Sequence, residues 1–84
     1  MSLTIYTKPN CPNCVMLKEL LLSRSVAFST IELNFGQTTV NPLMEVIDFK
    51  TKFPGVTTMP FFEFVKPDGS VETGGYMKAM NLFK

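Results

Sequence analysis

Apolar and polar positions alternate along the chain in short blocks, and the first half predicts a strand, a helix and a second strand. Residues 3–6 are an apolar run of β-favouring side chains, which the polar segment 8–10 ends. Pro12 is tolerated in the first turn of a helix, and leucines then recur at helical spacing, so a helix is predicted over residues 12–23. Residues 26–33 are again rich in β-formers and predict the second strand.

A second helix is predicted over residues 42–53. Asn41 is a favourable cap, and Pro42 suits the first turn because no backbone donor is needed there. Apolar residues then recur at helical spacing as far as Phe53. The following Pro-Gly pair ends the pattern, so the helix should stop at this point.

A β-hairpin and a closing helix are predicted for the last third of the chain. Residues 61–65 and 70–73 flank a Pro-Asp-Gly turn sequence, which indicates two antiparallel strands. Tyr76, Met80 and Phe83 have the i, i+4 and i+7 spacing of a short helix that packs one face on a sheet. The predicted order is β-α-β-α-β-β-α, an α/β fold with a four-stranded mixed sheet and three helices. Its first two strands should be parallel, with a right-handed crossover.

Length and charge favour one globular domain over residues 1–84. A chain of 84 residues with eight phenylalanines has one modest core and no room for a second domain. Eight basic residues nearly balance seven acids, so we expect neither nucleic acid nor membrane as a partner. The first residues lack the basic region of a signal peptide, and no apolar run approaches bilayer length. We therefore expect a cytoplasmic protein.

The strongest chemical signal is a CxxC motif, Cys11 and Cys14, at the junction of the predicted first strand and first helix. The backbone donors and the dipole of a helix N-terminus stabilise an anion. They are predicted to lower the pKa of the Cys11 thiol toward neutrality, with Lys8 as an additional cation. Cys11 is therefore the predicted nucleophile. Cys14 follows one helical turn later, within bonding distance, and is the predicted resolving thiol.

Other roles for the two cysteines are less favoured. A structural disulfide gains little from closing so small a loop in the chain-entropy account. A closed zinc site needs four ligands, whereas the chain has no histidine and only two cysteines, so no metal site is expected within one chain. An iron–sulfur cluster shared between two chains remains an alternative. A thioredoxin-like protein reduced by a flavoenzyme reductase is another.

Three segments, in this order and spacing, resemble a glutaredoxin, especially the short bacteriophage type: residues 7–14, Thr58-Met59-Pro60 and Gly74-Gly75-Tyr76. The resemblance covers nearly the whole chain and implies a thioredoxin-like fold and a dithiol protein-disulfide oxidoreductase. It implies glutathione as co-substrate, with no permanently bound cofactor. It also implies a monomer that serves disulfide-bearing proteins such as ribonucleotide reductase.

The resemblance also implies which residues form the site. Lys8 would meet a glutathione carboxylate, and Met59 would pair with the glutathione backbone. Gly75 and Tyr76 would border the γ-glutamyl end. The implied binding residues are Lys8, Pro12, Thr58, Met59, Pro60, Gly75 and Tyr76.

Pro60 is predicted to follow a cis peptide bond. A proline at the start of a strand is ordinarily an edge or turn residue, and only about 5–6% of X-Pro bonds are cis. After a CxxC helix, however, Met59-Pro60 falls where thioredoxin-like folds hold a cis-proline facing the nucleophilic cysteine. The backbone of Met59 would then offer hydrogen bonds to a substrate peptide, as one strand does to another.

The chain departs from the glutaredoxin pattern at three places. It lacks the tyrosine between the cysteines, a basic residue before Thr58 and an acid soon after Tyr76; these places hold Asn13, Thr57, and Met77 with Lys78. Lys50 or Lys52 of the predicted second helix could supply the missing basic charge. Both lysines also fit an ordinary solvated helix face.

Overall fold

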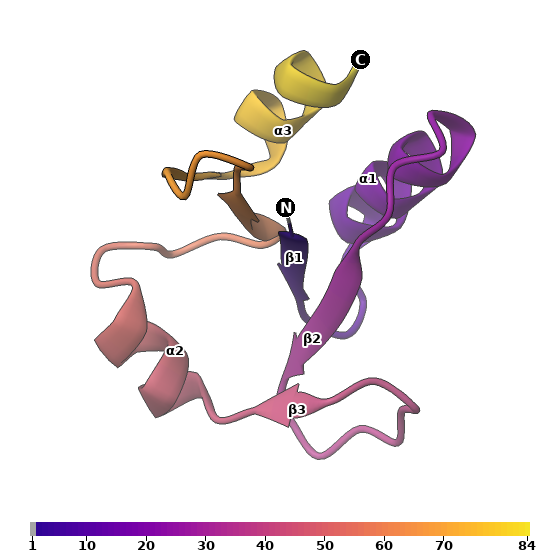
Figure 1. Ribbon diagram of the computed structural model, residues 1–84. Helices are drawn as coiled ribbons and strands as arrows, with labels where there is room; N and C mark the ends of the chain where they lie inside the picture. Colours follow the sequence, from indigo (N-terminus) through magenta and orange to yellow (C-terminus); the bar gives the residue numbers. More distant parts are fainter. Residues whose placement is uncertain (1) are drawn as a thin grey trace.

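The computed structural model describes residues 2–84, and Met1 lies outside the described residues. The elements follow the order β-α-β-β-α-β-β-α (Figure 1). They are β1 (Ser2–Thr7), α1 (Pro12–Ser23), β2 (Ser29–Leu33), β3 (Leu43–Met44), α2 (Val46–Lys52), β4 (Phe61–Val65), β5 (Val71–Gly74) and α3 (Tyr76–Phe83). The α/β class, the three helices and the mixed sheet agree with the prediction.

Five strands form one sheet in the order β3-β2-β1-β4-β5. The central strand β1 pairs in parallel with β2 and antiparallel with β4. At the edges, β3 lies parallel to β2 and β5 antiparallel to β4. Figure 1 shows α2 on the opposite side of the sheet from α1 and α3. The segment that leads to the cysteines therefore leaves directly from the central strand.

Side-chain alternation along the strands divides the core between the two faces of the sheet. On β1, Ile5 joins the cluster under α1 and α3, whereas its neighbour Tyr6 joins the cluster under α2. Phe62 and Phe61 of β4 divide in the same way. The Tyr6 ring lies 5.3 Å from the ring of Phe49, an α2 residue that is almost completely buried. Two apolar clusters thus hold the helices against the sheet.

The predictions of four strands and of a helix that begins at residue 42 are wrong. Leu43 and Met44 form β3, because the edge of β2 pairs with them: the backbone N–H of Asn34 donates to the Met44 carbonyl over 2.9 Å. Glu45 is extended, and α2 begins only at Val46. Two apolar residues in a row are compatible with a strand as well as with a helix, and here the hydrogen bonds to β2 favour the strand.

One smaller expectation also differs from the structure. The second strand begins at residue 29 and not at 26, since the Val26 N–H donates to the Leu21 carbonyl and completes the end of α1. In contrast, the predicted first helix, the first strand of the hairpin and the closing helix are confirmed, with bounds at Pro12–Ser23, Phe61–Val65 and Tyr76–Phe83.

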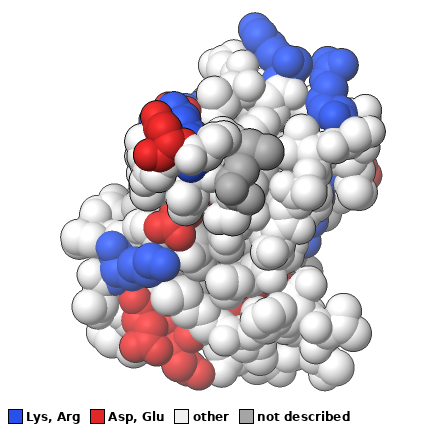
Figure 2. Space-filling model, in the orientation of Figure 1, with Lys and Arg blue, Asp and Glu red and all other residues white. Residues whose placement is uncertain are grey.

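Charged side chains of both signs lie on the face of the molecule seen in Figure 1. Figure 2 shows basic groups at the top, basic and acidic groups next to one another along the left, and a largely uncharged area at the lower right. This distribution fits a net charge of +1 over the whole sequence. Among residues 2–84, no helix has both the length and the apolar character needed to cross a bilayer.

Candidate active site

Cys11 and Cys14 are joined by a disulfide at the N-terminus of α1, with their Cα atoms 5.3 Å apart. Cys11 is the N-cap residue, and Cys14 lies in the first turn. Cys11 is 9% exposed and Cys14 only 2%. Cys11 is therefore the more accessible of the two cysteines, although they share one bond.

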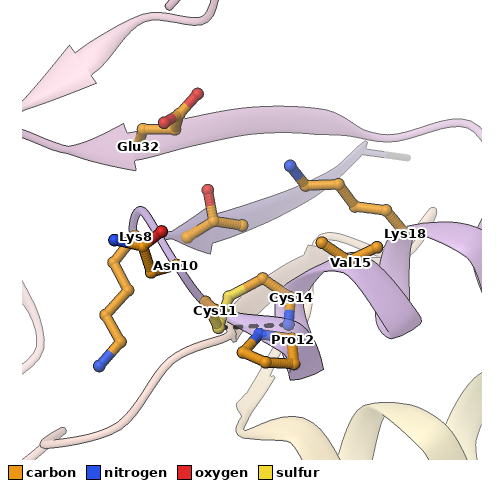
Figure 3. Close-up of a pocket in the computed structure, with 9 residues that line it drawn as sticks. Lys8, Asn10, Cys11, Pro12, Cys14, Val15, Lys18 and Glu32 are labelled. Atoms are coloured by element: carbon orange, nitrogen blue, oxygen red, sulfur yellow. Dashed lines mark hydrogen bonds between the residues drawn. A yellow bond between two sulfur atoms is a disulfide. The ribbon is translucent and has the colours of Figure 1, made fainter. Parts of the chain in front are cut away.

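Local sequence explains how Cys11 comes to cap the helix. Asn10 has a positive φ of 57°, a conformation that asparagine tolerates, and turns the chain out of β1 toward α1. Pro12 occupies the first helical turn, where it removes no needed donor. The Cys14 N–H then donates to the Cys11 Sγ over 3.2 Å (Figure 3). This donor and the helix dipole would stabilise a thiolate at Cys11 after reduction.

The predicted cis Met59-Pro60 bond is confirmed. The Met59 carbonyl oxygen lies 3.7 Å from the Cys11 Sγ. The sulfur carries no proton in the disulfide, so this is a contact; a reduced Cys11 thiol could donate to the same oxygen. An open depression of about 290 Å³ lies here; it is lined by Lys8, Asn10, Cys11, Pro12, Asn13 and Met59. The backbone beside Met59 thus borders the accessible sulfur.

A larger depression of about 490 Å³, which both cysteines line, opens between α1 and β2. Figure 3 shows Lys18 extending from α1 toward Glu32 of β2, while Lys8 points away from both. Thr39 and Asn41 donate to one Glu32 carboxylate oxygen, and Gln37 donates to the other. The hydrogen bond from Thr39 is the largest cause that lowers the pKa of Glu32, followed by the one from Asn41. Glu32 therefore anchors the loop after β2 as a carboxylate.

The Glu32→Gln variant tests this anchor through its pH dependence. Because the pKa in the folded state is below the ordinary value of 4.5, the stabilising contribution is present above that value and is lost as pH falls through the folded pKa. We expect the variant to lose on the order of 1 kcal/mol of unfolding free energy at neutral pH, an effect moderated by solvent screening. Urea denaturation across pH should show the gap to wild type closing below about pH 4. A gap of constant size at every pH would contradict this account, and Glu19→Gln on α1 is the control.

The two lysines of α2 have different surroundings. Lys52 lies 3.6 Å from the Glu63 carboxylate and donates to the Tyr6 hydroxyl over 3.4 Å. The bond to Tyr6 raises the pKa of Lys52, and the nearby Glu63 adds to the effect. Lys50 instead lines a third depression, of about 310 Å³, together with Lys8. Of the two lysines considered from the sequence, Lys50 is therefore the one that shares a cavity with Lys8.

The start of α3 lies close to the cis-proline. Gly75 is its N-cap residue, and a Cβ atom there would lie 3.9 Å from the Pro60 carbonyl oxygen. The Tyr76 hydroxyl contacts the Met16 Sδ of α1 at 3.8 Å, on the side of α3 that faces α1. Thr58 is exposed and lines none of the three depressions around the cysteines. Gly75 thus borders the Met59-Pro60 segment, whereas Tyr76 and Thr58 do not face the sulfur through these cavities.

Sequence reasoning missed the residues that build the cavity walls. Val15, Lys18 and Glu32 line the depression between α1 and β2, and Phe35 lines the one beside Lys50. Glu32 had one visible signal, a charged residue inside a β-favouring run. Phe35 carried none, since an aromatic residue in a polar loop is compatible with many positions.

Comparison with solved structures identifies the fold as thioredoxin-like. The thioredoxin-like protein BC3987 matches with a TM-score of 0.54 and 21% identity, covering 99% of this chain and all of its own. A point mutant of BC3987 gives a TM-score of 0.53 and 20% identity, with 98% and 97% of the two chains covered. These likenesses show the fold. A comparison with curated protein sequences finds no match.

The chain belongs to the glutaredoxin family, whose profile matches residues 3–60. The matched region contains both cysteines and extends to the cis-proline. The family predicted from the three sequence segments is therefore confirmed. Family membership and the Cys11–Cys14 disulfide indicate thiol–disulfide redox chemistry.

Proposed function

We propose that the protein is a dithiol oxidoreductase that reduces protein disulfides and glutathione mixed disulfides. The observation that carries the proposal is the disulfide at the start of α1, with Cys11 the more exposed of the two cysteines and the Met59 backbone beside it. A substrate strand that pairs with the Met59 backbone would bring its own sulfur to Cys11. A purely structural disulfide would not need this access.

The reaction moves two electrons from the cysteine pair to the substrate. The Cys11 thiolate attacks one substrate sulfur, and the other leaves as a thiolate that takes a proton from solvent. Cys14 then loses its proton and attacks the Cys11 sulfur of the mixed disulfide. The Cys11–Cys14 disulfide forms, and the remaining substrate thiol is released. The N-terminus of α1 favours the first step because it stabilises the attacking anion.

Glutathione is the proposed reductant that restores the dithiol. Lys8 and Lys50 line one cavity beside Met59, so either ammonium group could meet a glutathione carboxylate. Gly75 lies against Pro60 and leaves room for the γ-glutamyl end. Protein substrates in the cytoplasm, such as ribonucleotide reductase, and a monomeric state complete the proposal.

The electron donor is tested by supplying each reductant separately to the oxidised protein. We expect glutathione with glutathione reductase to support NADPH consumption in the presence of a disulfide substrate. Turnover with thioredoxin reductase alone, and none with glutathione, would replace this donor by a flavoenzyme. Absence of turnover with both, together with a brown dimer after anaerobic purification, would favour the cluster-binding alternative.

One observation weakens the case for glutathione and so keeps the flavoenzyme as a second candidate donor. Lys78 donates to the Thr73 carbonyl over 2.9 Å and packs over Gly74, where a Cβ atom would lie 2.5 Å from the lysine Cδ. A positive charge is thereby held at the start of α3. The ammonium of a γ-glutamyl group near Gly75 would be repelled, so glutathione would bind weakly.

Met77→Asp is expected to strengthen glutathione binding. Met77 is 70% exposed in the first turn of α3, so a carboxylate there could accept from the glutathione ammonium and also interact favourably with the helix N-terminus. An exposed contact of this kind is worth about 0.5–1.5 kcal/mol, which corresponds to an affinity gain of about twofold to tenfold. The measurement is the dependence of turnover on glutathione concentration at low salt.

Met77→Asn is the matched control, since asparagine has the same length and shape as aspartate but carries no charge. It should give little of the gain. Alkylation of Cys11 should be similar in both variants, because neither changes α1. Equal glutathione dependence in wild type and Met77→Asp would show that the γ-glutamyl end lies elsewhere.

A further inference from the structure

The cavity that Lys8 and Lys50 line has a mostly apolar interior. A carboxylate bound to the lysines would leave this interior unoccupied. Its apolar lining comes from β2, the loop after it, α2 and the segment before the cis-proline: Leu33, Phe35, Val46, Phe49, Val56 and Met59. At about 310 Å³ it is large enough for one large side chain. We call this cavity the apolar pocket. Phe35, 59% exposed, forms an accessible part of its wall.

The apolar pocket adjoins the depression that Cys11 lines. It shares Lys8 and Met59 with the depression that Cys11 lines. The Met59 carbonyl is 3.7 Å from the Cys11 Sγ. A peptide that joins its cysteine to Cys11 therefore passes the mouth of the pocket within a few residues.

The rim of the apolar pocket is positively charged. Lys8 and Lys50 line it, and none of its lining residues is acidic. Within residues 2–84 the ion pairs are Lys52 with Glu63 and Lys66 with Glu72, so neither rim lysine is neutralised by one. A partner that fills the pocket would best carry an acidic side chain beside the apolar one.

We infer that the apolar pocket receives a large apolar side chain of a protein substrate, placed near its reactive cysteine and accompanied by an acidic residue. The inference rests on the proposed disulfide-exchange function and adds the class of substrate. Glutathione has no apolar side chain and would leave the pocket unfilled. The site therefore favours a peptide of this composition over glutathione itself.

The test uses short peptides, each with one cysteine held as a mixed disulfide with 5-thio-2-nitrobenzoate. The reduced protein donates two electrons, forms the Cys11–Cys14 disulfide, and releases the peptide thiol and the coloured thiolate. Leucine is placed at each of the two positions on either side of the cysteine, with aspartate or serine beside it and serine elsewhere. We expect the best leucine–aspartate peptide to react about tenfold or more faster than the all-serine peptide.

Two variants locate the preference. Phe35→Ala should reduce the leucine-to-serine rate ratio at least severalfold, whereas Ile47→Ala, on an α2 position that is 71% exposed and outside the pocket lining, should preserve it. Lys50→Gln should reduce the aspartate preference and leave the leucine preference. The inference would be overturned if no leucine peptide reacted faster than the all-serine peptide. It would also be overturned if Phe35→Ala and Ile47→Ala lowered the leucine-to-serine rate ratio equally. If no peptide reacts, the all-serine peptide included, the disulfide-exchange function itself fails.

Discussion

Replacing Cys11 with serine is expected to abolish disulfide exchange, whereas replacing Cys14 is expected to trap the protein halfway. Cys11 is the more accessible cysteine and sits at the helix N-terminus, so we expect it to start the reaction. In Cys14→Ser the first attack still occurs, but no resolving thiol follows. Mixed disulfides with protein substrates should accumulate and be visible on a non-reducing gel, while the monothiol reaction with glutathione remains.

The same asymmetry should appear in alkylation of the reduced protein. At pH 7 an ordinary thiol is only a few per cent ionised, and a pKa near neutrality raises that fraction about tenfold. Iodoacetamide should therefore modify Cys11 about tenfold faster than Cys14, as quantified by mass spectrometry of the labelled peptides. Urea-unfolded protein, in which both thiols are exposed, is the control and should show similar rates. Faster labelling of Cys14 in the folded protein would reverse the assignment of nucleophile and resolving thiol.

Phe49→Ala is expected to cost about 3–5 kcal/mol of unfolding free energy, as large core truncations of phenylalanine do. Phe49 is 1% exposed, and its ring lies 5.3 Å from those of Tyr6 and Phe53. A chain of 84 residues has a total stability of roughly 4–13 kcal/mol, so the loss would be about a quarter of the total or more. Urea denaturation of the oxidised protein, followed by far-ultraviolet circular dichroism, measures the loss.

Phe35→Ala is the matched control, because it makes the same phenylalanine-to-alanine change at an exposed position. Its side chain is 59% exposed, so truncation should change the unfolding free energy by less than about 1 kcal/mol. The contrast separates burial from side-chain identity. A similar loss in both variants would mean that the cluster under α2 does not hold this helix to the sheet.

The sequence predicted those elements whose signals are local. A proline in the first turn, a CxxC motif and leucines at helical spacing all lie inside α1, and its bounds agree with the prediction. The closing helix was likewise visible in the spacing of Tyr76, Met80 and Phe83. Leu43 and Met44 were assigned to a helix because their hydrogen-bond partners on β2 are distant in sequence. No pattern confined to their own neighbourhood distinguishes the two outcomes.

The site divides in the same way. Cys11 and Cys14 are neighbours in sequence, so the chemistry of the pair was readable, and the cis bond before Pro60 followed from the family resemblance. The sequence does not show whether Lys50 or Lys52 lies beside the cavity that Lys8 lines. That depends on the rotation of α2 about its axis, which is set when Phe49 of this helix packs against the sheet. The structure brings Lys52 to Tyr6 and Glu63 and leaves Lys50 beside the apolar pocket. Tertiary packing, which periodicity does not specify, made this distinction.

The central position of β1 also sets how local opening is distributed around the site. β1 is hydrogen-bonded on both edges, so its amide protons exchange with solvent by the rarest and most global openings, and the cysteines follow it directly. β3 pairs through two residues at the edge of the sheet, and α2, seven residues long, follows it. Opening of β3 alone therefore breaks few hydrogen bonds. We expect the β3 amide protons to exchange faster than those of β1, so the strand that leads to the cysteines is the last part of the sheet to open.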